Sequence, residues 1–164
     1  MNTPGSIIRA PGEGEKRAFH GGGLHTWKLL AEDTDGAFYL MEDVMSQGKC
    51  TPMHRHPEAA EMVYVLEGEI VVNIDGEETT VSAGGMTFTP KGVPHAFVVV
   101  SGRARLLSLQ TPGHGQAFYR DASEPTTDDT SDTVDMASLQ ASAKENPSGV
   151  ELLGPPPFEA LAAH

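Results

Sequence analysis

The feature of this chain that most constrains its fold is a series of short apolar runs between residues 36 and 111, interrupted by glycine or proline. The runs are rich in Val, Ile, Phe and Tyr, and a turn-forming residue follows about every eight to twelve positions. This spacing is typical of an all-β sandwich or barrel. Asp75 and Gly76, which lie between two runs, favour a hairpin turn. The predicted strands are AFYLMEDVM, TPMHRH, EMVYVLEG, EIVVNI, EETTVSA, MTFTP, HAFVVV and ARLLSLQT.

The segments on either side of this β-rich region have a different composition. Residues 1–35 are rich in glycine and charge, and we expect an N-terminal arm there with one short strand near LHTWKLLA. After the barrel, predicted over 36–112, residues 113–164 predict a helical and acidic extension. Within it, GQAFYRDASEP favours a short helix that ends before Pro125, and DMASLQASAKEN favours an amphipathic helix with Asp135 as its N-cap. The apolar and proline-rich segment GVELLGPPPF follows.

The length and net charge of the chain indicate a single domain and disfavour negatively charged partners. With 164 residues the chain is long enough for one domain with a hydrophobic core, and its formal net charge is -12 at pH 7. This charge argues against binding to nucleic acid or to an anionic membrane surface, because both carry negative charge. Residues 121–164 hold nine Asp and Glu against the single Lys144, which we interpret as a solubilising tail.

We expect a cytoplasmic protein. No apolar run approaches the roughly 20 residues that a membrane helix needs. The first residues, MNTPGSIIRAPGEGEKRAF, lack the long apolar stretch of a secretory signal. Cys50 is the single cysteine, so an internal disulfide is excluded, and this agrees with a reducing compartment.

Four residues combine into a predicted metal site. Alternate side chains of a strand share a face, so His54 and His56 can bind one ion through their imidazole rings. Glu61 begins the next strand, and His95 begins a later one after a turn that proline and glycine stiffen. Three imidazoles and one carboxylate suit one divalent ion per chain, with Ni, Mn, Fe, Co, Cu and Zn all open. The other histidines match no ligand position and are predicted not to bind: His20, His25, His114 and His164.

The spacing of these residues resembles the two signature motifs of the cupin superfamily. The resemblance implies a double-stranded β-helix, or jelly-roll barrel, in which the three histidines and the glutamate bind the metal. Val99 stands where the second motif has an asparagine, and that asparagine is not a metal ligand in the family. The residues that match the first motif are Gly48, His54, His56, Glu61 and Gly68, and those that match the second are Gly84, Pro90, Gly92 and His95.

Alternation along the strands also predicts the lining of a substrate pocket. Side chains that share the inward face with Glu61 or His95 should lie near the metal. The last strand of the barrel allows two registers, one with Leu107 and Leu109 inward and one with Leu106 and Ser108 inward. An apolar pocket favours an apolar or aromatic substrate over a sugar phosphate or a polyanion. The predicted lining residues are Val63, Val65, Phe97, Val99, Leu107 and Leu109.

Over residues 36–158 the chain resembles bacterial single-domain quercetin 2,3-dioxygenases, in the segments DGAFYLMEDVM, EMVYVLEGEI, TPKGVPHAF, ARLLSLQTPG and GVELLGPPPF. The resemblance implies that Glu61 removes the proton of a flavonol 3-hydroxyl before the substrate reacts with O2. It also implies that the C-terminal helices cap the mouth of the barrel, and that two chains form a homodimer. Two alternatives stay open: a metal-dependent isomerase or lyase that acts on a small oxo-acid, and a non-catalytic cupin that binds a small molecule.

Overall fold

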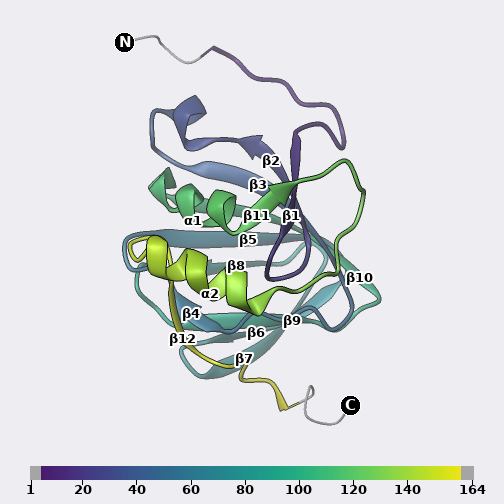
Figure 1. Cartoon of the computed structure of the whole chain (residues 1–164). Helices are drawn as coiled ribbons and strands as arrows, with labels where there is room; N and C mark the ends of the chain where they lie inside the picture. Colours follow the sequence, from purple (N-terminus) through teal and green to yellow (C-terminus); the bar gives the residue numbers. More distant parts are fainter. Residues whose placement is uncertain (1–4, 160–164) are drawn as a thin grey trace.

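The computed structural model describes residues 5–159, which form two antiparallel β-sheets with short helices at one side (Figure 1). The first sheet has seven strands in the order β11-β1-β2-β3-β10-β5-β8, and the second has five in the order β12-β4-β9-β6-β7. All strand pairs are antiparallel, and the predicted all-β fold is confirmed. The strands are β1 (Glu15–Phe19), β2 (Leu24–Leu29), β3 (Tyr39–Ser46), β4 (Met53–Arg55), β5 (Ala60–Glu67), β6 (Glu69–Ile74), β7 (Glu77–Ser82), β8 (Met86–Thr89), β9 (His95–Val99), β10 (Arg103–Thr111), β11 (Ser123–Pro125) and β12 (Glu151–Gly154).

The alternation of apolar residues explains how the sheets pack. In β3, buried and half-buried side chains alternate along the whole strand, so one face of the sheet turns inward. Side chains from both sheets meet in a shared apolar core, and burying them supplies most of the driving force for the fold. The core residues are Met45, Val63, Val65, Ile70, Val72, Val99, Ala104 and Leu106.

The hairpin predicted at Asp75 and Gly76 joins β6 and β7. Both residues have positive φ angles, 53° and 89°, and Ile74 pairs with Glu77 across the turn. Two consecutive residues with positive φ fit the tight turn whose twist matches that of the flanking strands.

The first part of the chain contributes two strands to the seven-stranded sheet. β2 corresponds to the strand predicted near LHTWKLLA, and β1 pairs with β2 on one side and with β11 on the other. Because β2 also pairs with β3, sheet pairing continues across the boundary predicted between residues 35 and 36. The chain reverses direction between β1 and β2 in a glycine turn, residues 21–23. Gly22 and Gly23 both have positive φ, which glycine adopts without strain.

Two helices of the C-terminal extension lie next to each other beside the sheets (Figure 1). They are α1 (Gln116–Asp121) and α2 (Met136–Glu145), and short 3-10 turns cover Ala31–Thr34 and Gly113–Gly115. Asp135 is the N-cap of α2 as predicted, because its carboxylate accepts a hydrogen bond from the Ser138 amide. Within the described residues, no helix has the length and apolar character to cross a membrane.

Candidate metal centre

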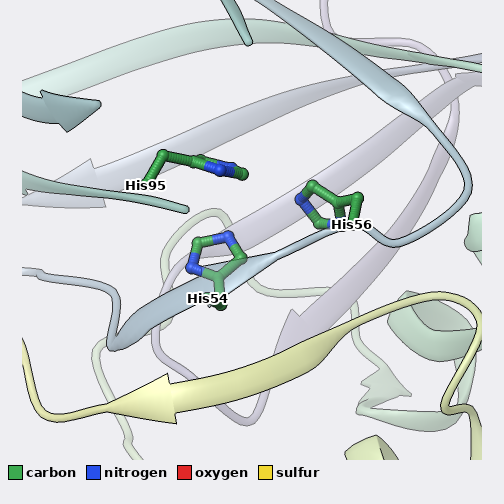
Figure 2. A group of neighbouring side chains, drawn as sticks. All are labelled: His54, His56 and His95. Atoms are coloured by element: carbon green, nitrogen blue, oxygen red, sulfur yellow. The ribbon is translucent and has the colours of Figure 1, made fainter. Parts of the chain in front are cut away.

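Three histidine side chains meet inside the barrel. His54 on β4 is the direct cross-strand partner of His95 on β9, and His56 follows at the end of β4. One nitrogen atom from each ring lies within 4.8 Å of those of the other two. Figure 2 shows the three rings gathered around one point. All three side chains are buried, so the centre is shielded from bulk water.

A main-chain carbonyl oxygen holds the Nδ1 atom of each ring. The Nδ1 atoms of His54 and His95 lie 2.8 Å from Pro52 O and 2.9 Å from Val93 O. His56 Nδ1 lies 2.9 Å from Gly149 O. A carbonyl oxygen can only accept, so each Nδ1 carries the hydrogen and each Nε2 keeps its lone pair. This arrangement is the one in which imidazole binds a metal through Nε2.

Glu61 completes the group from β5. Its Oε2 atom lies 3.1 Å from His56 Nε2, and its Oε1 atom lies 3.3 Å from His95 Nε2. Since Nδ1 already carries the hydrogen, these contacts bring acceptor atoms face to face unless a proton or a metal ion lies between them. His95 Nε2 is also buried without a hydrogen-bond partner among residues 5–159. The three histidines can therefore hold a divalent metal ion, and the Glu61 carboxylate contacts two of them.

The charges of these groups suit metal binding near neutral pH. Burial lowers the pKa of His54 well below its ordinary value, and the neighbouring His95 and His56 lower it further. Burial alone would raise the pKa of Glu61, but the two adjacent imidazoles hold it well below the usual range. Burial opposes protonation of His95, yet contact with Glu61 raises its pKa overall. The centre thus offers a carboxylate anion together with a neutral His54.

Gln110 is a further site residue that sequence reasoning missed. It is fully buried on β10, directly opposite Glu61 in the strand register. Its amide Nε2 donates a hydrogen bond of 3.0 Å to Glu61 Oε2, and it lies 3.4 Å from the hydroxyl oxygen of Tyr119. A glutamine at an inward position of an apolar strand was the available signal, but only the pairing of β10 with β5 gives it a partner.

A cavity of about 490 Å³ opens beside the metal centre. His54 and Glu61 form part of its wall, and Val63 and Phe97 line it as predicted. Cys50, a free thiol, lines it as well. The helices close one side, which agrees with the predicted cap, through Phe118, Tyr119, Met136 and Leu139.

The other predicted lining residues lie elsewhere. Val65 and Val99 belong to the apolar core between the sheets. Ser108, rather than Leu107 or Leu109, lines the cavity. β10 therefore adopts the register with Leu106 and Ser108 inward, and the opposite alternation places Leu107 and Leu109 on the outer face.

Comparisons with known proteins agree with this geometry. Residues 41–109 match the family model described as "Cupin domain". The chain is 27% identical over 114 residues to quercetin 2,3-dioxygenase of Bacillus subtilis (strain 168). This match covers 70% of this chain and 34% of that protein. It is 32% identical over 56 residues to an uncharacterised protein of Methanocaldococcus jannaschii, and this match covers 34% of this chain and 45% of that protein. The chain thus spans between a third and a half of the length of these relatives.

Solved structures share the fold. KdgF from Halomonas sp. has a TM-score of 0.60 at 17% identity, and the match covers 66% of this chain and 94% of that one. A predicted oxalate decarboxylase from Thermotoga maritima has a TM-score of 0.59 at 21% identity, covering 65% and 99%. An RmlC-like cupin from Shewanella frigidimarina has a TM-score of 0.55 at 23% identity, covering 66% and 94%. Residues 41–109 of this chain thus match the cupin domain, and the chain shares its overall fold with these solved structures.

Proposed function

We propose that this protein is a metal-dependent dioxygenase that acts on a flavonol-like or other enolisable aromatic substrate. The observation that carries the proposal is the position of Glu61, whose carboxylate contacts two imidazoles of the metal centre and also lines the cavity. The similarity to the Bacillus subtilis protein named quercetin 2,3-dioxygenase supports the reaction class.

His54, His56, His95 and Glu61 would hold one divalent transition ion. Such an ion would supply Lewis-acid chemistry toward a substrate oxygen or O2. Nickel, manganese, iron, cobalt, copper and zinc all suit this set of nitrogen and oxygen donors.

The residues of the chain then have distinct tasks. Glu61, an anion with a lowered pKa, accepts the proton of the substrate hydroxyl that reaches the centre. Gln110 holds the Glu61 carboxylate in position through its hydrogen bond. Apolar side chains such as Val63, Phe97 and Phe118 orient a flat ring and keep water away from it.

Replacement of the proposed base tests the reaction. Glu61→Gln keeps the size of the side chain but cannot accept the proton, so O2 uptake with flavonols should fall at least about 100-fold. Glu67→Gln, a change on the same strand in a half-exposed side chain, is the matched control and should retain activity. The measurements are oxygen-electrode rates, elemental analysis of protein purified without added metal, and ligand binding by calorimetry.

The wild-type result separates this proposal from the alternatives. One metal ion per chain, with turnover of a small oxo-acid and no O2 uptake, would support an isomerase or lyase. Ligand binding that Glu61→Gln leaves unchanged, with no turnover in either protein, would support a non-catalytic cupin. The proposal also places the enzyme in the cytoplasm, where the free thiol of Cys50 stays reduced.

A further inference from the structure

A second group of polar side chains lines the same cavity, outside the metal centre. His25 on β2 and Asp43 on β3 are cross-strand partners, and both line the cavity. They are almost completely buried, with 1% and 7% of their surface exposed. Lys49, from the loop after β3, lines the cavity as well. The proposed proton transfer at Glu61 uses none of these three residues.

Two atoms of this group are buried without a hydrogen-bond partner among the described residues: His25 Nδ1 and Asp43 Oδ1. His25 Nε2 lies 3.7 Å from Asp43 Oδ2, which is too far for a hydrogen bond between them. An unpaired buried polar atom destabilises a protein. Two such atoms beside a cavity therefore point to a ligand that supplies the missing partner.

The surroundings hold the group in a fixed arrangement. The ring of His25 stacks on Phe19, with 4.6 Å between the ring centroids. Lys49 Nζ lies 5.2 Å from the centroid of the same Phe19 ring. Gly23 leaves space at the carboxylate, since a Cβ atom there would lie 2.8 Å from Asp43 Oδ1. The unpaired carboxylate oxygen thus faces a position where the chain has no side chain.

Tyr119 connects this group with the metal centre. Its ring centroid lies 5.8 Å from that of His25 and 6.4 Å from that of His56. Glu61 and Asp43 line the same cavity, and Tyr119 and Phe118 form part of its wall, so a flat ligand that meets Glu61 with one hydroxyl shares the cavity with Asp43.

We infer that Asp43, with His25 and Lys49 beside it, binds a second hydroxyl group at the remote end of the aromatic substrate, an inference that rests on the function proposed above. A hydroxyl fits this group because it can donate to Asp43 and accept from the Lys49 ammonium. A remote carboxylate or phosphate does not fit, since Asp43 and Asp132 both line the cavity. The substrate class is therefore an aromatic compound with several hydroxyl groups and no anionic substituent.

A matched pair of 3-hydroxyflavones tests this inference, one with hydroxyl groups on the remote phenyl ring and one without. Dissociation constants are measured by calorimetry on the metal-loaded full chain in the absence of O2. Wild type should bind the hydroxylated compound about tenfold more tightly. Asp43→Leu should bind both compounds equally, and Asp43→Asn should keep part of the preference. Asp132→Asn removes the same charge from an exposed position on the cavity wall and should keep the full preference.

A second measurement separates loss of recognition from loss of fold. Leucine removes the unpaired buried oxygen, so Asp43→Leu should melt at or above the wild-type temperature. Its KM for the hydroxylated compound, taken relative to its KM for the compound without remote hydroxyls, should rise by about tenfold over the wild-type ratio.

The outcomes distinguish this inference from the proposed function. Equal binding of both flavones by wild type, or an unchanged preference in Asp43→Leu, overturns the inference, while O2 uptake with both flavones leaves the proposed function standing. Wild-type protein that binds neither flavone overturns both.

Discussion

At the scale of single residues, the metal centre depends on main-chain atoms as much as on the motif side chains. The carbonyl oxygens of Pro52, Val93 and Gly149 fix which nitrogen of each imidazole carries the hydrogen. A main-chain carbonyl does not titrate and is unaffected by substitution of its own side chain. The carbonyl contacts that orient the three rings therefore do not themselves depend on pH.

Gln110→Leu should weaken metal binding although Gln110 is not a ligand. The substitution removes the hydrogen bond to Glu61 and leaves the carboxylate free to turn, and loss of such a supporting partner typically costs about 10-fold to 100-fold in affinity. Competition with a chelator gives the dissociation constant. Gln140→Leu, an exposed change on α2, is the control. Unchanged affinity in Gln110→Leu would show that Glu61 needs no such support.

The pH dependence of stability should reveal the buried carboxyl of Asp43. Burial raises the pKa of Asp43 to about 7, against the opposing effect of the Lys49 charge, from an ordinary value of 3.8. Below both values the carboxyl is protonated in the folded and unfolded chain alike. The cost of burying its charge therefore grows as pH rises through this window, and it is fully present above about pH 7.

Asp43→Asn cannot ionise, so its stability relative to wild type should increase with pH. The gain between about pH 5 and pH 8 should be about 3 kcal/mol, because the window contributes about two pH units above pH 5 and each is worth about 1.4 kcal/mol. Urea unfolding of the metal-free protein at both pH values measures it. Asp132→Asn, an exposed carboxyl, should show no such trend. A gain that shrinks with rising pH would contradict the burial of an ionisable Asp43.

The sequence predicted residues that act within fixed local spacings better than residues that meet across strands. His54, His56 and His95 come together as expected, because alternation and the turn before His95 determine their faces. Gln110 and Asp43 could not be assigned, since each finds its surroundings through the pairing of a distant strand. His25 was set aside as matching no ligand position, yet it is one of the most deeply buried side chains.

At the scale of elements, β10 is a strand whose inward face could not be predicted from its pattern of apolar residues. The run ARLLSLQT has apolar residues at both odd and even positions, so alternation allowed two registers. In the observed register, Leu107 and Leu109 lie on the outer face and pair with Tyr64 and Met62 of β5. Met62 pairs in turn with Phe88 of β8, so the two leucines have apolar neighbours on that face. β1 was missed for a related reason, since EKRAF is mostly polar and becomes a strand by pairing with β2 and β11.

Asp135→Ala should loosen α2 and lower the stability of the protein. The carboxylate of Asp135 accepts hydrogen bonds from the amide and the hydroxyl of Ser138, and alanine provides neither. We expect the melting temperature to fall by roughly 2–4 °C. Differential scanning calorimetry measures the change, with Asp132→Ala as a control outside the helix. A melting temperature equal to that of wild type would mean that α2 does not need its cap.

At the scale of the whole molecule, the outer face of the seven-stranded sheet is unusually apolar near its β8 edge. Tyr64 and Leu66 on β5, and Met86 and Phe88 on β8, are between 37% and 57% exposed. We call these four residues the β8 face. Exposed apolar side chains on an edge strand favour association with another protein surface. The homodimer predicted from the sequence would bury them.

We propose that the β8 face forms the homodimer interface, so the double substitution Met86→Glu and Phe88→Glu, which places two charges there, should give a monomer. Light scattering coupled to size-exclusion chromatography gives the mass of each species. Ile8→Glu changes an apolar residue that is 90% exposed outside this face, and the variant should remain dimeric. A wild-type protein that elutes as a monomer would refute the dimer.

The hydrogen bond between His56 and the carbonyl of Gly149 joins partners that are 93 residues apart. Gly149 lies between α2 and β12, in a part of the chain that holds none of the motif ligands. Affinity for the ion and attachment of the C-terminal segment are therefore thermodynamically linked, and such linkage is reciprocal. Detachment of the C-terminal segment therefore removes the hydrogen bond that orients the His56 ring and lowers the affinity for the ion. Binding of an ion to His56 in turn stabilises the attached segment.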